Sequence, residues 1–200
     1  MGVDRTPART MEADPSRRNV TMFAGGMGGT WHVERMQALV GPPLQAVSRV
    51  AVLESKHGSG AGSATWRLHG VTSYERYVNR GERAALAAHQ AVLGRPEATR
   101  AALIPIRKSA SWWNLTPDVR RTIFEEDSHH IATGLKYLPA IARRLYHCRE
   151  LGEPFDFLTW FEYTPSDAGA FDELVDVLRG TEEWTYVERE VNIRIIKDGG

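Results

Sequence analysis

The sequence predicts an α+β protein in which helices pack on one face of an antiparallel sheet. Two observations lead to this class. The second half of the chain carries strand and helix patterns in the order strand, helix, strand, strand, helix, strand, and the first half adds further strand patterns with one helix. The chain has 200 residues, of which 42% are hydrophobic, and this is enough for the core of a single domain.

The first half is expected to form a small lobe made mostly of strands. Residues 1–19 contain arginine and proline but no apolar run, so we expect a disordered tail there. Strand patterns then flank a glycine turn in VTMFAGGMGGTWHVERMQAL, and they return in SRVAVLES and ATWRLHGVTSY, on either side of the flexible KHGSGAGS. The alanine-rich GERAALAAHQAVLG predicts a helix that Gly94 ends. Together, residues 20–98 would form this reduced N-terminal lobe.

The second half opens with an apolar strand and a long helix. AALIPIRKS predicts a short strand, and Pro105 within it favours a sheet edge or a bulge. Thr116, Pro117 and Asp118 form a typical helix start, with a capping hydroxyl, a proline at the first position and an acid in the first turn. We expect this helix to continue to about Gly134.

A hairpin, a helix and a strand complete the chain. AIARRLYHC and FDFLTWFEY flank the turn-like RELGEP and predict a hairpin. Ser166 or Asp167 begins a helix that Gly180 ends, and its apolar residues recur at helical spacing: Phe171, Leu174, Val175 and Leu178. The last strand, WTYVEREVNIRII, alternates between an apolar face and a polar face: Val187, Val191, Ile193 and Ile195 against Glu188, Glu190, Asn192 and Arg194. Residues 99–197 therefore predict a ferredoxin-like βαββαβ unit, and residues 20–197 a single domain whose sheet the first lobe extends.

The composition excludes several classes of protein. The 25 basic and 25 acidic residues cancel, so no net field favours nucleic acid or an acidic membrane. Cys148 is the only cysteine, which excludes an internal disulfide and favours a reducing compartment. No stretch is long and apolar enough to cross a membrane, and the N-terminus lacks the apolar core of a signal peptide. We therefore expect a cytoplasmic protein without membrane or nucleic-acid partners.

Two adjacent histidines in DSHHIATG are candidates for a ligand, and a helical wheel distinguishes them. At about 100° per residue, His130 falls inside the apolar arc of the expected helix. His129 falls outside this arc, beside Thr122. The arc consists of Val119, Ile123, Phe124, Ile131 and Gly134. His130 is thus expected to point inward, although a lone inward histidine is more often a core residue than a ligand.

A ligand role for His130 requires a partner for its second ring nitrogen, because such a partner fixes the tautomer. The acids of TEEW, residues 181–184, stand at the start of the last strand and are candidates for that partner. The chelating motifs H-x3-H, H-E-x-x-H and C-x-x-C do not occur in the chain. A single axial histidine among tryptophan, leucine and isoleucine instead suits haem, whose porphyrin supplies four further ligands.

Two adjacent arginines in IARRLYH lie on a predicted strand, so they face opposite sides. Alternation groups Arg143 with Ile141 and Leu145. It groups Arg144 with Tyr146 on the other side. The larger aliphatic neighbours favour the pocket side for Arg143, but a snorkelling or ion-paired arginine explains the pattern about equally well.

Long contiguous blocks of the chain resemble a known family. AALIPIRKSASWW, IFEEDSHHIATGLKYLPAIARRLYHCRELGEPFDFLTWFEY and LRGTEEWTYVEREVNIR closely resemble the chlorite dismutases, specifically the short, dimeric bacterial lineage. The resemblance covers residues 20 to 196, nearly everything but the tail. It implies a dimeric fold of α/β barrel type, with haem b in the C-terminal lobe.

The resemblance also implies roles for individual residues, position by position. His130 resembles the proximal haem ligand, and Glu183 with Lys108 resembles the network that holds this ligand. Arg143 resembles the distal catalytic arginine, and Gln90 a distal glutamine that hydrogen-bonds it. Less specifically, haem-pocket walls are implied at Ile104, Trp112, Trp113 and Leu138. The long tail and the second arginine of the pair depart from the family pattern without touching these motifs.

The reaction that the resemblance implies is the conversion of chlorite to chloride and dioxygen, through a ferryl species and a transient hypochlorite that the distal arginine holds. A coproheme decarboxylase-like enzyme and a haem-binding protein without turnover are the alternatives. Arg143 and the short chain disfavour the first of these. We expect a homodimer, because the short N-terminal lobe is typical of the dimeric lineage and an open sheet would leave edges for a second subunit to cover.

Overall fold

The computed structural model describes residues 20–54, 63–72 and 77–199. The predicted disordered tail, most of the glycine-rich stretch and the end of the fourth strand pattern lie outside the described residues. The strands are β1 (Val20–Gly26), β2 (Trp31–Val40), β3 (Arg49–Glu54), β4 (Trp66–Thr72), β5 (Arg100–Lys108), β6 (Ala142–His147), β7 (Phe157–Tyr163) and β8 (Val187–Lys197). The α-helices are α1 (Arg80–His89), α2 (Ala110–Asn114), α3 (Pro117–Arg121), α4 (His130–Tyr137) and α5 (Ala168–Arg179). A π-helical turn, η3 (Thr122–Asp127), precedes α4, and a 3-10 turn, η6 (Glu182–Tyr186), precedes β8.

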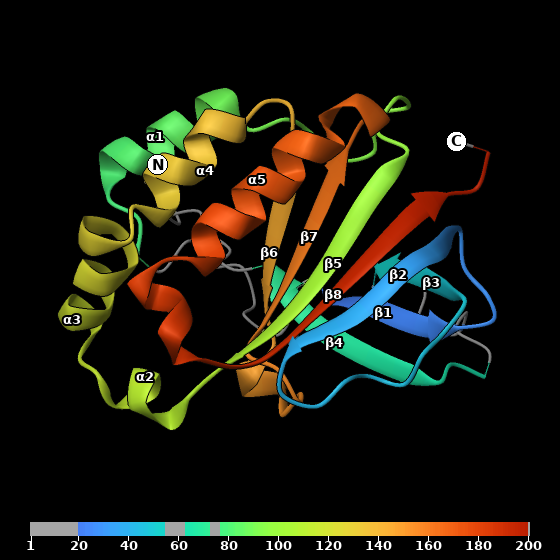
Figure 1. Cartoon of the computed structure of the whole chain (residues 1–200), viewed down its shortest axis with the longest axis horizontal. Helices are drawn as coiled ribbons and strands as arrows, with labels where there is room; N and C mark the ends of the chain where they lie inside the picture. The colour runs from blue at the N-terminus through green and yellow to red at the C-terminus, as the bar shows by residue number, and fades with distance from the viewer. Residues whose placement is uncertain (1–19, 55–62, 73–76, 200) are drawn as a thin grey trace, which may run out of the picture.

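The described strands close into a barrel in the order β1-β3-β2-β8-β5-β7-β6-β4. Each pairing is antiparallel, and β4 closes the ring by pairing with both β1 and β6. Figure 1 shows β1 to β4 on one side of the molecule and the helices on the other, against β5, β6 and β7. The predicted α+β class is confirmed. The order of elements from β5 to β8 is also the predicted one, and the ferredoxin-like description remains an interpretation of that order.

The expectation of an open sheet with exposed edges is wrong for the described strands. Each of them pairs on both sides, because the N-terminal strands curl round to meet β6 and β8. Closure of the ring removes the unpaired backbone N–H and C=O groups through which an edge strand can pair with another chain. Unpaired edges therefore give no reason to expect a second subunit.

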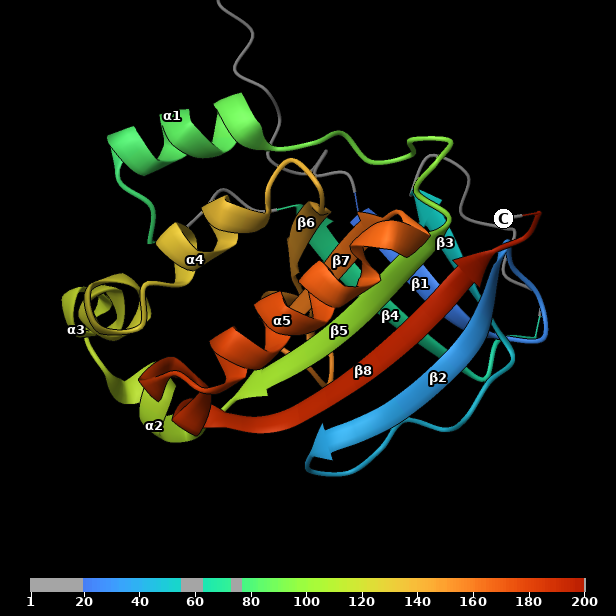
Figure 2. The same cartoon turned by 45° about the horizontal axis from the view of Figure 1, so that its top comes forward.

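Two cores share the C-terminal strands. One fills the barrel and includes Phe23, Leu103, Tyr146, Trp160 and Ile193. The other lies outside the barrel, where α5 covers β5 and β7, as the turned view in Figure 2 shows. The predicted apolar positions of α5 are all buried in this outer core: Phe171, Leu174, Val175 and Leu178. Residues 101–106 of β5 are all apolar and buried because this strand has a core on each face. In the described part of the chain, no helix combines the length and the apolar character needed to span a bilayer.

The predictions for Pro105 and for the end of the first helix need correction. Pro105 lies inside β5, between β7 and β8, and not at a sheet edge. A register irregularity between β5 and β8 does occur nearby, at Arg107 and Lys108. Helix α1 ends at His89, whereas Gly94 lies beyond it in a turn with a left-handed φ of 82°.

The helix expected from residue 117 to Gly134 is broken into α3, η3 and α4. His129, with a left-handed φ of 50°, precedes the first residue of α4. The wheel that assumed one continuous helix is therefore wrong, and its reference residue Val119 is exposed. Histidine, aspartate and serine are among the residues that favour turns or left-handed conformations, and they occur together at 127–129.

The polar face expected on β8 is wrong at Glu190, which is 1% exposed. That face of the strand is covered by α5 and η6, which supply partners for its carboxylate. Val187, expected on the same face as Val191, packs in the outer core instead of the barrel. The register irregularity opposite Val187 accounts for this, because a bulge changes which face the next side chain takes.

The closure of the barrel depends on a close approach between β4 and β6. A Cβ added at Gly70 would lie 2.6 Å from the Cβ of Tyr146, an atom that cannot move without the β6 backbone. Gly70→Ala is expected to lower the free energy of unfolding by about 1–3 kcal/mol, the usual cost of overpacking. Gly28→Ala is the control, since nothing lies within 4 Å of the place that its Cβ would take. Urea unfolding measures both, and equal stabilities would contradict the importance of this close approach.

Candidate functional site

A large cavity lies between the helices and the outer face of β5, β6 and β7. It contains about 1240 Å³ of empty space, part of which opens to solvent. Its walls are mainly aliphatic and aromatic, and they include three of the four predicted haem-pocket residues, Ile104, Trp112 and Leu138. The charged and polar side chains that reach this lining are Lys108, His130, Arg143, His147, Thr159, Arg179, Glu183 and Glu190. An apolar cavity with a few convergent polar groups is typical of a ligand site.

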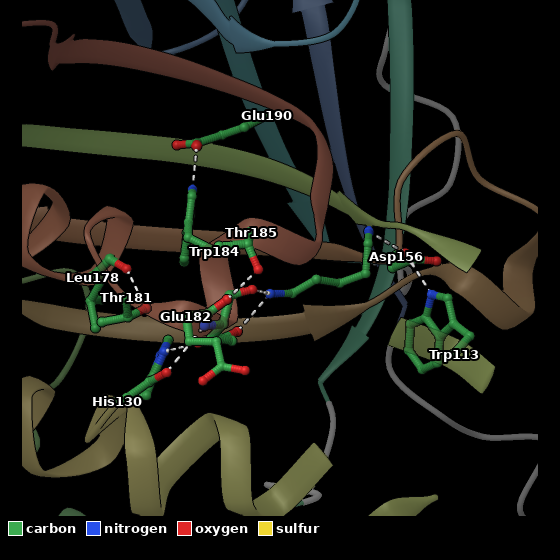
Figure 3. Close-up of polar contacts among 12 residues, drawn as sticks. Trp113, His130, Asp156, Leu178, Thr181, Glu182, Trp184, Thr185 and Glu190 are labelled. Atoms are coloured by element: carbon green, nitrogen blue, oxygen red, sulfur yellow. Dashed lines mark hydrogen bonds and ion pairs between the residues drawn. The ribbon is translucent and has the colours of Figure 1, made fainter. Parts of the chain in front are cut away.

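His130, Glu183 and Lys108 form a linear chain of contacts in one wall. The Nδ1 atom of His130 lies 2.7 Å from one carboxylate oxygen of Glu183. Lys108 donates to the other carboxylate oxygen at 2.8 Å and to the Glu183 backbone carbonyl at 2.9 Å. Figure 3 shows His130 at one end of this chain of contacts. Because Nδ1 is engaged by Glu183, the Nε2 atom of His130 is the ring nitrogen left for a ligand in the cavity.

The Glu183 carboxylate is charged although it is buried. Burial raises its pKa, but His130 and Lys108 outweigh this through their charges and hydrogen bonds and bring the pKa to about 2. Burial lowers the pKa of Lys108, and the nearby Glu183 partly offsets that shift. The Lys108 ammonium also lies over two indole rings, 4.8 Å from the centre of Trp112 and 5.4 Å from that of Trp184. Such rings favour a desolvated cation through their quadrupoles.

Asp156 supports this wall from behind. Its carboxylate accepts a hydrogen bond from the Lys108 backbone N–H at 2.8 Å and another from the Trp113 indole at 3.1 Å. Figure 3 shows Trp113 and Asp156 together, away from His130. Trp113, predicted as a pocket wall, is not among the residues that line the cavity. It stacks on Phe157, which does line it, so Trp113 backs the wall without forming it.

Arg143 reaches the same cavity from β6. It lines the cavity together with Leu145, whereas Tyr146 of the same strand packs inside the barrel. Arg144 is exposed. The strand alternation of the sequence is therefore the geometry observed. Gln90, which follows α1, donates from its side-chain amide to the backbone carbonyl of Arg143 at 2.5 Å.

A second buried carboxylate at the cavity was missed by the sequence analysis. Glu190 accepts hydrogen bonds from Arg179 at 2.6 and 3.0 Å and from the Trp184 indole at 2.9 Å. Figure 3 shows Trp184 directed at Glu190. All three residues line the cavity. Alternation along β8 gave no sign of this, because a charged residue on a polar strand face predicts solvent exposure.

Breaking the ion pair between Lys108 and Glu183 is expected to destabilise the fold. Removing one partner of a buried pair leaves an uncompensated charge and typically costs about 3–5 kcal/mol. Lys108→Met should therefore lower the free energy of unfolding of the protein by about that amount. Lys136→Met, an exposed position on α4, is the matched control. Urea unfolding followed by far-UV circular dichroism measures both, and a small, equal effect in the two variants would contradict the prediction.

Comparison with known proteins identifies relatives over most of the chain. The model of the chlorite dismutase family matches residues 30–197. The chlorite dismutase of Ideonella dechloratans is 37% identical over 94 residues, which are 47% of this chain. The match spans 31% of that protein, about a third of the length of this curated relative.

Solved structures with the same fold extend this result. The dimeric chlorite dismutase of Nitrobacter winogradskyi has 59% sequence identity and a TM-score of 0.83, over 88% of this chain and 99% of that chain. A mutant chlorite dismutase of Candidatus Nitrospira defluvii has a TM-score of 0.66 at 19% identity, with 90% of each chain covered. At that identity, the second likeness bears on the fold alone. From the match over residues 30–197 and the similarity to the Nitrobacter protein, the chain belongs to the chlorite dismutase family.

Proposed function

We propose that this protein is a haem b enzyme that converts chlorite to chloride and dioxygen. The observation that carries the proposal is the chain of contacts from Lys108 through Glu183 to His130 at the wall of an apolar cavity that Arg143 also lines. It places a histidine prepared as a ligand and the permanent cation of Arg143 in the same space. The family relationship and the similarity to a dimeric chlorite dismutase support the choice of reaction.

The residues present fit a bound haem. His130 has one ring nitrogen on an ionised carboxylate, which is the arrangement that fixes a metal-binding imidazole and raises its basicity. The cavity walls are mainly aliphatic and aromatic, with a few convergent polar groups, which suits an apolar macrocycle. The buried indole nitrogen of Trp112, at the cavity, has no acceptor among the described residues, and a polar group of a ligand would satisfy it. His130 would thus hold the iron, with Ile104 and Leu138 against the macrocycle.

When bound, haem would supply the redox chemistry by which chlorite loses an oxygen atom and an oxygen–oxygen bond then forms. The reaction needs no external oxidant, since one chlorite yields one chloride and one dioxygen. Arg143 would bind the small anions. Its guanidinium carries a permanent charge and rigid donors, and an apolar cavity strengthens its attraction for chlorite and for the hypochlorite formed from it.

Gln90 and Glu183 would act through other residues. Gln90 donates to the backbone carbonyl of Arg143 and so holds the β6 main chain in place. This fixes the point from which the Arg143 side chain extends. Glu183 contacts Nδ1 of the His130 ring and so increases the electron density on Nε2, the nitrogen that would bind the iron. Neither residue would need to exchange a proton with the substrate.

We also propose that the protein works as a homodimer in the cytoplasm. The 59% identical relative is described as dimeric, and this similarity, in place of unpaired sheet edges, now carries the dimer proposal. Residues 20–197 would form the single catalytic domain, with the site in the part that follows residue 98.

An oxygen electrode tests the proposed reaction directly. The protein is reconstituted with haem b, chlorite is added, and oxygen release is followed. Stoichiometric oxygen from chlorite is the expected result. Haem binding without oxygen would favour a binding protein, and turnover of coproheme with peroxide would favour the decarboxylase-like alternative.

His130 and its neighbour should differ sharply in haem binding. His130→Ala removes the proposed ligand and should abolish the Soret spectrum of the wild-type complex. His129→Asn keeps a residue type that tolerates the left-handed conformation and should leave the spectrum unchanged. Absorption spectra of haem titrations measure both variants. Equal loss in the two would show that His130 is not the ligand.

Arg143 should retain the reactive hypochlorite near the iron, whereas Arg144 should not. A charge-assisted hydrogen bond is worth about 1.5–3 kcal/mol, so its loss in Arg143→Ala should raise escape of hypochlorite roughly 10- to 100-fold. The variant should lose activity early in turnover, and added methionine should intercept hypochlorite and prolong its activity. Arg144→Ala, on an exposed side chain, is the control. Identical behaviour of the two variants, or no protection by methionine, would contradict the role of Arg143.

A further inference from the structure

The segment between α3 and α4 contacts the proposed ligand pair at three points. This segment, residues 122–129, consists of the π-helical turn η3, Ser128 and His129. Such turns occur preferentially at functional sites, because an inserted residue redirects the side chains that follow.

The first contact caps the helix that carries His130. Helix α4 begins at His130, and its N-cap residue, His129, makes no side-chain cap. The carboxylate of Glu125 takes that role from the preceding turn, since it accepts from the backbone N–H of Ile131 at 2.5 Å and from that of Ala132 at 3.1 Å. These are two of the backbone donors that a helix start otherwise leaves unsatisfied.

The second contact is made to the imidazole itself. The ring of Phe124 stacks on the ring of His130, with centroids 4.3 Å apart and planes at 23°. The third contact is made to its partner, because the Ser128 hydroxyl accepts from the backbone N–H of Glu183 at 3.1 Å. One short segment therefore fixes the helix of His130, the plane of its ring and the main chain of its carboxylate partner.

The geometry of the segment explains how Glu125 reaches the helix start. Glu125 is buried, whereas the next two residues, Glu126 and Asp127, are exposed. The left-handed His129 turns the chain so that α4 starts beside the π-helical turn and not in line with it. A left-handed non-glycine residue is disfavoured on its own and persists where the surrounding contacts impose it. Here the two hydrogen bonds from Ile131 and Ala132 to the Glu125 carboxylate connect the chain on either side of His129.

Glu125 also supplies charge. The start of an α-helix carries a partial positive charge, and His130 is the first residue of α4. Without compensation, that charge would withdraw electron density from the imidazole. A carboxylate on the first backbone N–H groups cancels it. Glu125 is therefore placed to influence both the orientation of the His130 ring and how strongly the His130 imidazole donates electron density to a metal.

We propose that Glu125 is a positioning residue for His130, which sets the orientation of the imidazole through the cap on α4 and lowers the reduction potential of the bound iron through its negative charge. This inference rests on the proposed function, in which His130 binds haem iron. It assigns no contact between Glu125 and substrate or haem.

The test compares Glu125→Ala and Glu125→Gln with Glu126→Ala and Glu126→Gln. The neighbouring Glu126 is a matched control, because its carboxylate is exposed and accepts only from the Thr122 side chain among the contacts described. Three quantities are measured in the full chain: the affinity of the cofactor-free protein for haem b, the iron reduction potential of the complex, and the urea unfolding of the cofactor-free protein. The last detects a variant that has lost its fold.

Glu125→Ala is expected to weaken haem b binding about tenfold or more, as removal of a ligand's supporting partner typically does, and to raise the reduction potential. Glu125→Gln keeps an acceptor oxygen but no charge, so its affinity should lie between those of the wild type and Glu125→Ala while its potential still rises. Both Glu126 variants should match the wild type. The glutamine variant keeps the test decisive if the alanine variant does not fold.

Two results would overturn the inference in distinguishable ways. If the Glu125 variants unfold more easily but keep the affinity and potential of the wild type, Glu125 only stabilises the fold and the inference is wrong. If His130→Ala keeps the wild-type Soret spectrum, His130 does not bind the iron, and the proposed function and the inference are wrong together.

Discussion

The buried carboxylate of Glu183 lies between the His130 ring and the Lys108 ammonium, and much of the structure around the cavity is arranged to make this possible. A buried charge is costly unless it is paired and hydrogen-bonded. The two partners come from α4 and β5, while Glu183 itself comes from the turn before β8. Three segments far apart in sequence must therefore converge within hydrogen-bond distance. This requirement fixes where α4 lies relative to the barrel.

The cavity follows from how the helices divide the outer face of the sheet. Helix α5 packs directly on β5 and β7 and fills its part of that face. Helix α4 contacts α5, with Tyr137 against the outer core, and it also packs with α1 in a small cluster around Leu86, Ile131 and Leu138. The space between the two packing arrangements stays open and is lined by both helices. Because the barrel core holds β5 and β6 from the inside, their outward side chains can line this space on a rigid support.

Sequence patterns predicted the parts of the site that depend on local periodicity. Alternation placed Arg143 on the cavity side, and the helical spacing of α5 identified its buried face. The helical wheel selected His130 although it wrongly assumed a continuous helix. His130 points inward for another reason, because α4 begins at this residue, next to Glu183. The burial of Glu190 and Glu125 could not be predicted, because it depends on partners in neighbouring elements and on a backbone turn that residue type alone does not specify. Position at the start of the last strand made the acids of TEEW candidates for the partner of His130, whereas the choice of Glu183 and the roles of Lys108 and Gln90 came from family resemblance.

The two sides of the proposed site are held in different ways. His130 has a stacked aromatic ring, a buried carboxylate on Nδ1 and a capped helix beneath it, so these contacts fix the ring itself. Arg143 extends from β6, which pairs with β7 from Ala142 to His147, and Gln90 donates to its backbone carbonyl. These contacts fix the main chain from which the guanidinium extends into the cavity. In the proposed function, a fixed imidazole keeps the affinity for the cofactor constant, and a cation on a rigid strand keeps its charge in the space where small anions would bind.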